Sequence, residues 1–206
     1  RVPRPGGAWN KTSPWTNRSY LFLTRLSEAQ VEQGIAMARR GGFHLVLLDQ
    51  GSWCRSTGHY EISPSRFPGG LEALKRAFQK FRDAGVRVGL HFLGASIYPP
   101  DAYLTPVPDP RLVKDAFAEL AADVDEKATA IPVAADPKDF PAEDGGYMGK
   151  GSVLQIGEEL IWYKTRSAGP AHGFAGCVRG YLGTTKAPHR KGDRVAHVLK
   201  SYGYYL

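Results

Sequence analysis

The chain has 206 residues, enough for one large domain or two small ones at roughly 100–200 residues per domain. Hydrophobic residues make up 42% and charged residues 23%, an ordinary globular composition with no run of about 18 apolar residues that could span a membrane. The net charge of +7 comes from scattered Lys and Arg, whereas a nucleic-acid partner would require them along one face. We therefore expect a solvated basic surface, with neither a membrane span nor a nucleic-acid partner.

The first predicted elements are a short strand and an amphipathic helix. Residues 1–19 are rich in Pro, Gly and Asn and indicate a loop, which leads into a strand over residues 19–23. Ser27 and Gln30 have the spacing of a capping box, in which their side chains satisfy backbone amides at the start of a helix. Apolar residues at helical spacing then predict a helix over residues 28–40.

Strands and helices continue to alternate up to about residue 122. The nearly continuous apolar run at residues 43–48 predicts a strand buried on both faces, as in a parallel sheet. A loop over residues 50–69, a helix over 70–83 and a second buried strand over 86–92 follow. The pattern of residues 110–122 predicts a further helix. Such alternation predicts parallel β/α units with right-handed crossovers.

Residues 124–197 have a different pattern, typical of a small and mostly antiparallel β module. Residues 128–133 favour a strand, and residues 154–163 alternate in the way of a hairpin. Residues 174–179 and 194–199 would add two further strands. Because no helical period of useful length is present in this part of the chain, we expect a second, β-rich module.

These patterns together predict an α/β fold, a partial (β/α) TIM-type barrel with an inserted, mostly antiparallel β module. Residues 1–123 would form the N-terminal β/α units, residues 124–197 the insert, and residues 198–206 a return to the barrel. A closed barrel needs about 250 residues, and three parallel strands would leave two apolar edges bare. We therefore expect a fragment whose partner is the remainder of a longer parent chain.

Polar and aromatic side chains follow two of the predicted strands, where the active site of a barrel would lie. Asp49 could hydrogen-bond sugar hydroxyls or handle protons, and the alternative is a helix or turn cap. Trp53 could stack on a sugar ring or pack within its loop. His91 would point to the same rim, or it would be a hydrogen-bonded core histidine. Taken together, the three residues predict a substrate-binding site.

Other sequence patterns for catalysis or cofactor binding are not matched. The chain has no GxSxG elbow and no HExxH motif, and the glycines at residues 145–151 lack the spacing of a phosphate loop. Glu158 and Glu159 are neighbours on a predicted strand and would point to opposite faces, so they would not act as a paired acid and base. The histidines and the two cysteines lack metal-ligand spacing. We expect no metal and no cofactor, and no catalytic residue is assigned.

Part of the chain, residues 43–93, resembles the barrel of α-galactosidase-type glycoside hydrolases. The resemblance rests on three segments: Leu48-Asp49-Gln50-Gly51-Ser52-Trp53, Ser65-Arg66-Phe67-Pro68-Gly69-Gly70-Leu71 and Ala84-Gly85-Val86-Arg87-Val88-Gly89-Leu90-His91. Gln50 and His91 stand where a second Asp and a Trp are usual. The resemblance implies that Asp49 binds sugar. It also implies that the nucleophile and the acid/base are aspartates on later strands, and nothing in this chain matches them.

The second module resembles a small β module of phage-tail and surface proteins. The segments that carry this resemblance are Ala128–Val133, Leu154–Tyr163, Gly176–Thr184 and His189. It implies no catalysis, and it suggests an insert in a loop that flanks the substrate cleft.

The sequence therefore predicts a fragment of a glycoside hydrolase that acts on a glycan. Its substrate-binding residues would lie in this chain, and its catalytic carboxylates on missing downstream strands. The chain would then be part of a glycosidase, an O-glycosyl hydrolase whose substrate is a carbohydrate. The alternative is a non-catalytic carbohydrate-binding or surface-structural protein, in which the β module is the working part.

Overall fold

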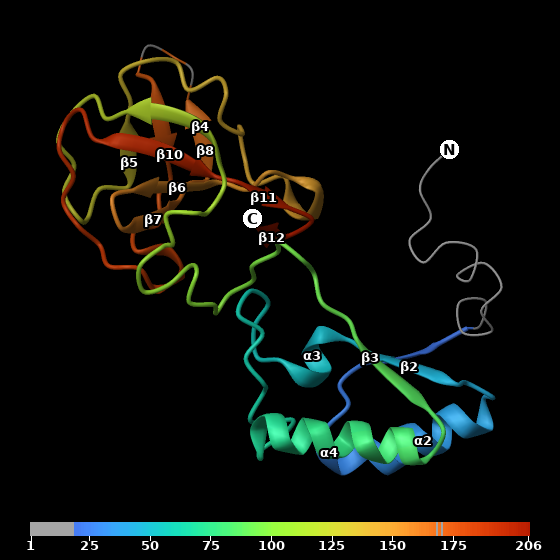
Figure 1. The fold of residues 1–206 in the computed structure, drawn as a ribbon. Helices are drawn as coiled ribbons and strands as arrows, with labels where there is room; N and C mark the ends of the chain where they lie inside the picture. Colours follow the sequence, from blue (N-terminus) through green and yellow to red (C-terminus); the bar gives the residue numbers. More distant parts are fainter. Residues whose placement is uncertain (1–18, 168, 170) are drawn as a thin grey trace. The chain divides into compact units, whose positions relative to one another are not determined.

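The computed structural model describes residues 19–206, apart from residues 168 and 170, and it divides into two compact units (Figure 1). Unit 1 contains the described residues up to Arg55, together with Tyr60–Leu93. Unit 2 contains Ser56–His59 and Gly94–Leu206. Residues 94–123 therefore group with the β-rich part of the chain, because the strand at residues 114–119 pairs with the strand at residues 194–198.

Unit 1 is built on a three-stranded parallel sheet. Its strands are β1 (Leu21–Leu23), β2 (Leu45–Leu48) and β3 (Arg87–Leu90), in the order β1-β2-β3. The helical elements are η1 (Glu28–Gln30), α2 (Val31–Arg40), α3 (Gln50–Trp53) and α4 (Gly70–Asp83). The predicted strands near residues 19–23, 43–48 and 86–92, and the helices over 28–40 and 70–83, are confirmed within a few residues.

The start and end of α2 follow from local chemistry. The capping box is confirmed, since the backbone N–H of Ser27 donates to Oε1 of Gln30 at 3.1 Å. After α2, Gly42 has a φ of +69°, a left-handed conformation that glycine adopts without steric cost. These two signals set the ends of the helix on either side of its apolar stripe.

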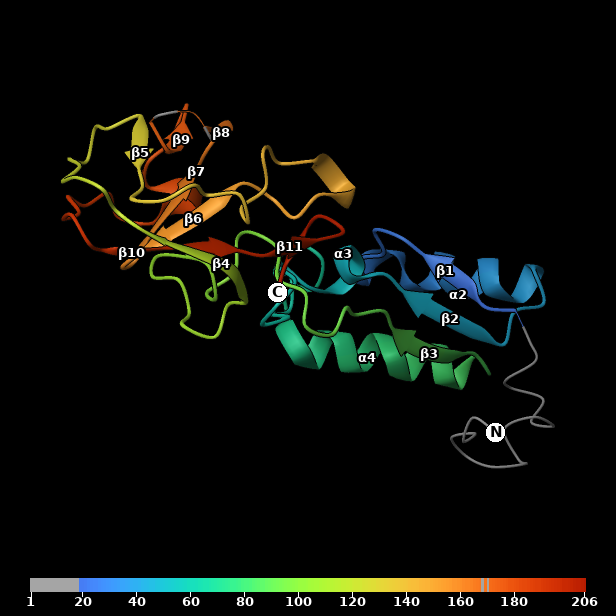
Figure 2. The same cartoon turned by 90° about the horizontal axis from the view of Figure 1, so that it is seen from above.

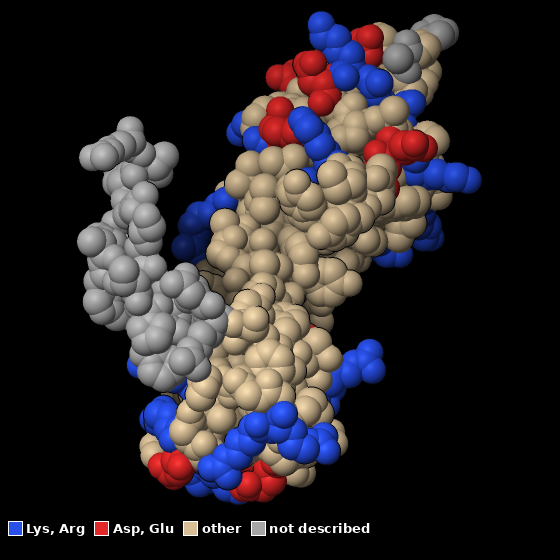
Figure 3. All heavy atoms as spheres, turned by 90° about the vertical axis from the view of Figure 1, so that its right-hand side faces the viewer, with Lys and Arg blue, Asp and Glu red and all other residues tan. Residues whose placement is uncertain are grey.

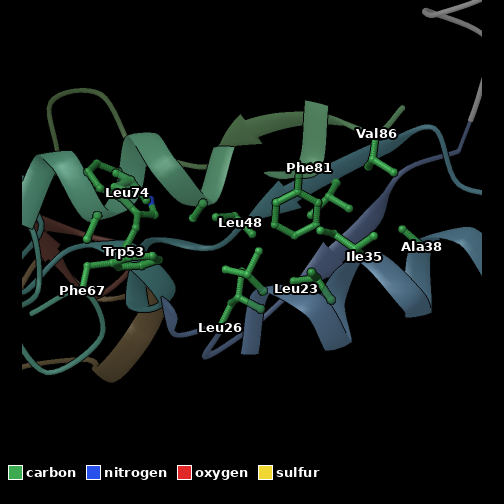
Figure 4. Close-up of a cluster of buried hydrophobic side chains, with 14 of the residues drawn as sticks. Leu23, Leu26, Ile35, Ala38, Leu48, Trp53, Phe67, Leu74, Phe81 and Val86 are labelled. Carbon is green, nitrogen blue, oxygen red and sulfur yellow. The ribbon is translucent and has the colours of Figure 1, made fainter. Parts of the chain in front are cut away.

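A single hydrophobic core lies between the helices and one face of the sheet (Figure 4). Leu23 and Leu48 project from neighbouring strands toward Ile35 of α2 and Phe81 of α4. Figures 1 and 2 show α2 and α4 lying along the sheet on the same side. Fully burying a side chain of this size contributes about 1.5–3 kcal/mol, so this layer accounts for much of the stability of unit 1.

The expected partial TIM-type barrel is wrong for the described residues. The parallel sheet of unit 1 has three strands and helices on one face, and the remaining sheets are small and antiparallel. On the opposite face of the parallel sheet no described helix packs, and Phe22 of β1 is 43% exposed. Local β/α alternation signals parallel pairing of neighbouring strands, but it carries no information on whether the sheet closes.

Unit 2 contains three antiparallel sheets within the part of the chain that the structure describes. The first has the strand order β4-β10-β6-β7 and contains β4 (Lys114–Glu119), β6 (Val153–Ile156), β7 (Glu159–Trp162) and β10 (Arg194–Val198). The second has the order β5-β9-β8 and contains β5 (Ala130–Pro132), β8 (Thr165–Ser167) and β9 (Gly173–Ala175). The third is the hairpin of β11 (Lys200–Ser201) and β12 (Tyr204–Tyr205). Two short 3-10 helices, η2 (Gly146–Met148) and η3 (Tyr181–Gly183), lie in the loops.

The hairpin expected over residues 154–163 is confirmed by the pairing of β6 with β7, but the helix expected over residues 110–122 is wrong. Residues 114–119 form β4, which pairs with β10. Ala116 and Leu120 are buried and fit a helical spacing of four, but they also fit the alternation of a strand. Phe117, between them, is 52% exposed, so the strand period is the one that is realised.

The charged surface is mixed in sign. On the face drawn in Figure 3, Lys and Arg are interspersed with Asp and Glu. On unit 1, for example, Lys80 of α4 pairs with Glu32 of α2 at 2.8 Å. Among the described helices, none combines the length and apolar composition that a bilayer crossing requires.

A buried ionic network organises the loops of unit 2. The fully buried Glu159 carboxylate accepts from Nε and Nη2 of Arg179 at 2.9 and 2.7 Å, and it contacts Nε2 of His189 at 2.8 Å. It also accepts from the backbone N–H groups of Gly180 and Ala187. One carboxylate therefore joins three stretches of chain that belong to the segment expected to be a distinct module.

The pKa of Glu159 is lower than its ordinary value of 4.5. Burial by itself raises this pKa, but hydrogen bonds from Arg179, Gly180, His189 and Ala187 outweigh burial because they favour the charged form. Since the pKa is lower in the folded state than in the unfolded state, ionisation stabilises unit 2 above about pH 4.5. That contribution is lost as the pH falls through the folded-state pKa.

We expect Glu159→Gln to lower the free energy of unfolding of unit 2 by about 3 kcal/mol, because Arg179 would stay buried without its counter-charge. The variant should also lose part of the stabilisation that the wild type gains above pH 4.5. Urea denaturation followed by circular dichroism at several pH values measures both effects. Glu158→Gln is the matched control, since that neighbouring side chain is exposed. Equal stability of the two variants would contradict a structural role for the network.

Candidate functional site

The ends of the three parallel strands are held in line by the backbone. The N–H of Asp49 donates to the carbonyl of Leu23 at 3.1 Å, and the N–H of His91 donates to the carbonyl of Leu48 at 2.7 Å. Asp49 and His91 are therefore neighbours across adjacent strands, which lie about 4.8 Å apart. By alternation along their strands, both side chains belong to the face of the sheet that α2 and α4 do not cover.

The carboxylate of Asp49 is only partly satisfied. Its Oδ1 accepts from the hydroxyl of Ser52 at 2.6 Å, and among the described residues none donates a hydrogen bond to Oδ2. Asp49 stands at the N-cap position of α3, but its carboxylate makes no capping hydrogen bond. A role as helix cap therefore explains the backbone position of Asp49 but not the role of its carboxylate. Among the described residues, Oδ2 of this half-buried side chain has no donor.

The imidazole of His91 is oriented by Gln50. Its Nδ1 lies 2.8 Å from Oε1 of Gln50, and a carbonyl oxygen can only accept, so Nδ1 carries the proton. In the neutral ring, Nε2 is then an acceptor. The ring of Phe22 packs edge-on against His91 with centroids 5.5 Å apart, which fixes the plane of the imidazole. We call Asp49, Gln50 and His91 the strand-end site.

Trp53 lies in the core and not at the rim. It is 6% exposed, its indole stacks on the ring of Tyr60 at 5.5 Å and 13°, and its Nε1–H donates to the carbonyl of His91 at 3.3 Å. Both a ring face and the polar edge of Trp53 are thus engaged within the protein. The exposed aromatic ring in contact with the strand-end site is that of Phe22, which is 43% exposed. Phe92, the residue after His91, is 63% exposed and packs edge-on against Tyr60.

Tyr60 links this aromatic group to the chain after β3. Its hydroxyl accepts from the N–H of Leu93 at 2.8 Å and donates to the carbonyl of Leu93 at 2.7 Å. The residue has a φ of +53°, which is unusual for a bulky side chain. Trp53, Tyr60 and Phe92 therefore form one aromatic group, which hydrogen bonds tie to the backbone of His91 and Leu93.

The strand-end site offers hydrogen bonds and not thiolate chemistry. Burial, with the nearby charge of Asp49, raises the pKa of the Cys54 thiol to about 11, and burial raises that of Cys177 to about 11. Both cysteines are free and protonated near neutral pH. Within the described ranges, no three or more His, Cys, Asp or Glu side chains are grouped so that they could hold a metal ion.

A second polar cluster, in unit 2, has a structural explanation. The buried carboxylate of Asp101 accepts from the hydroxyl of Ser56, from two groups of His59 and from the N–H of Tyr103. Burial raises the pKa of Asp101, but these hydrogen bonds outweigh burial and the pKa is lowered. At Gly58, a Cβ atom would lie 2.6 Å from the Asp101 carboxylate. This carboxylate therefore serves to hold its own loops.

The sequence predicts that Asp49 and His91 lie at the same rim, and the structure places them side by side. The residues that contact their side chains were not predicted. Gln50 stands where the α-galactosidase-type pattern has a second Asp, and in this structure its amide contacts His91. Ser52 and Phe22, which contact Asp49 and His91, belong to no sequence motif. The position of Ser52, three residues after Asp49 at the end of a strand, was the signal that could have predicted its hydrogen bond to that carboxylate.

Comparisons with known proteins give no match for this chain, whether against protein-family models, curated proteins or solved structures. The geometry of the strand-end site is therefore the basis for its function. At the carboxyl edge of a parallel sheet, it consists of a carboxylate with one oxygen to which no described residue donates, an imidazole oriented by Gln50, and the ring of Phe22.

We expect Ser52→Ala to destabilise unit 1 by about 1–3 kcal/mol. The Ser52 hydroxyl is fully buried and accepts from the N–H of Leu26 at 3.0 Å, so its removal leaves that buried N–H without an acceptor. Thermal unfolding monitored by circular dichroism measures the loss. The exposed Ser65→Ala is the control, and an unchanged midpoint for Ser52→Ala would refute the anchoring role.

Proposed function

We propose that the chain binds a carbohydrate at the strand-end site. The observation that carries this proposal is the half-satisfied carboxylate of Asp49 next to the oriented imidazole of His91. In parallel sheets, ligands bind outside the carboxyl ends of the strands, which is where both residues lie. The resemblance of residues 43–93 to α-galactosidase-type enzymes gives Asp49 the same role.

The chemistry of these groups suits a sugar. A carboxylate oxygen accepts from a hydroxyl, and vicinal sugar hydroxyls present several such donors in a fixed arrangement. Nε2 of His91 accepts from a further hydroxyl when neutral. Phe22, which packs against His91 and is 43% exposed, adds an apolar ring that would contact the C–H face of the same ligand.

Binding is favoured over hydrolysis by this chain alone. Hydrolysis of a glycosidic bond uses two carboxyl groups about 5–9.5 Å apart. The residues that directly follow β1, β2 and β3 are Thr24-Arg25, Asp49-Gln50 and His91-Phe92, which include one carboxylate.

A second candidate is the substrate-binding part of a glycoside hydrolase whose catalytic carboxylates are supplied from outside this chain. It is favoured by the position of Asp49 directly after a parallel strand, as the resemblance implies. Both candidates predict that this chain alone does not hydrolyse glycosides. An assay with aryl glycosides tests this, because release of the aryl alcohol by the chain alone would contradict both.

We expect Asp49→Asn to weaken sugar binding by about 10- to 100-fold, since a hydrogen bond to a charged acceptor contributes about 1.5–3 kcal/mol. The amide still accepts from the hydroxyl of Ser52, so the fold should be retained. Isothermal titration calorimetry with neutral mono- and oligosaccharides, α-galactosides included, measures the affinity.

The matched control is Asp83→Asn, which makes the same charge change at an exposed position of α4. It should bind sugar as the wild type does. If Asp49→Asn and Asp83→Asn bind with equal affinity, the strand-end site does not contact the ligand. If no sugar of the panel binds the wild type, the proposed function is wrong.

A further inference from the structure

Unit 2 presents a cluster of exposed apolar side chains that its own packing does not use. Tyr147 is 65% exposed, Met148 73% and Tyr202 57%. The first two come from η2 and the third from the turn between β11 and β12, and Figures 1 and 2 both show η2 beside β11. The rings of Tyr147 and Tyr202 are 5.7 Å apart and inclined by 64°. We call these three residues the tyrosine tip.

Tyr202 occupies its place at a conformational cost. The two residues of the turn, Tyr202 and Gly203, have φ values of +49° and +82°, as in the type I′ turn that favours Asn-Gly. A bulky side chain in this region of conformational space is rare and strained. Strain of this kind persists only where the surroundings enforce it, and it concentrates at functional sites.

The surroundings of the tip are built to hold the two rings. A Cβ atom at Gly203 would lie in ordinary van der Waals contact with the ring of Tyr147, at 3.4 Å, so that ring lies against the turn. Lys200 of β11 binds the chain on both sides of η2, because its Nζ pairs with Asp144 before η2 at 3.0 Å and its N–H donates to the carbonyl of Lys150 after η2 at 2.8 Å. The two rings therefore contact each other while both side chains stay exposed.

The size and charge of the tip define its ligand. A buried aromatic side chain contributes about 150–250 Å², so three side chains stay below the roughly 800 Å² that each partner supplies to a stable protein interface. The two nearby lysines are paired, Lys200 with Asp144 and Lys150 with Asp115. A ligand that covers only these side chains is therefore small, and neither of the two paired lysines favours an anion. The hydroxyl groups of the two rings can hydrogen-bond to it.

We propose that the tyrosine tip is a second carbohydrate contact, which takes a neutral sugar residue against the rings of Tyr147 and Tyr202. The choice of sugar as the ligand class rests on the proposed function of the strand-end site. The tip itself rests on different residues in a different unit, so each site is tested by its own variants.

The experiment titrates full-length chains with neutral mono- and oligosaccharides and follows them by calorimetry and saturation-transfer NMR. The variants are Tyr147→Ala and Tyr202→Asn, each made in the wild type and in Asp49→Asn. Tyr202→Asn removes the ring with a residue that tolerates positive φ, so we expect its melting temperature to be equal to or higher than that of the wild type. Phe117→Ala removes an exposed ring elsewhere in unit 2 and is the control.

In the Asp49→Asn background we expect residual sugar binding that falls at least fivefold with either tyrosine variant and is unchanged by Phe117→Ala. Loss of binding in the tyrosine variants alone, with Asp49→Asn neutral, would support the tip and reject the strand-end site. The reverse pattern would overturn the tip and leave the strand-end site standing. A change from dimer to monomer in sedimentation, without any change in sugar affinity, would also overturn it, because the tip would then bind a second copy of the chain.

Discussion

The pairing of β2 with strands on both sides is the constraint on which unit 1 depends. This one strand aligns Leu23, Leu48 and Leu90 on the face that packs against the helices. The same register brings Asp49 and His91 side by side one residue later. A shift of one residue in the pairing register would exchange the buried and exposed faces of the strand. The same register is therefore required for both the core and the strand-end site.

Three carboxylates of this chain illustrate how a protein treats a charge that it takes out of water. Glu159 and Asp101 are buried and are surrounded by donors, so their charge is spent on holding loops in unit 2. Asp49 has one donor on one oxygen, and no described residue donates to the other. Incomplete satisfaction at a half-exposed position distinguishes a group available to a ligand from one that serves the fold.

The elements of unit 1 could be predicted from the sequence because their signals are local. A capping box at Ser27, a glycine after α2 and uninterrupted apolar runs each decide a boundary within a few residues. Closure of the sheet is not local, which is why a barrel was expected and an open sheet is found. The helix prediction around Ala116 is wrong for another reason. Apolar residues four apart there fit both a helix and a strand, and only the pairing with β10 decides between the two.

The same limit applies to the site. Asp49 and His91 could be found because each directly follows a strand, whereas the burial of Trp53 depends on a stacking partner seven residues later and on a carbonyl after β3. An aromatic residue in a loop has the same sequence signature whether it faces solvent or the core. Tyr202 likewise has no motif, because its distinctive property is a backbone angle.

The two free cysteines are distributed one to each compact unit, Cys54 in unit 1 and Cys177 in unit 2. Each is buried and protonated, so a thiol reagent reaches it only when the surrounding structure opens. The chain therefore carries a built-in reporter of local opening for each unit. The rate at which each sulfur is labelled would distinguish a protein that opens in one cooperative step from one whose units breathe independently.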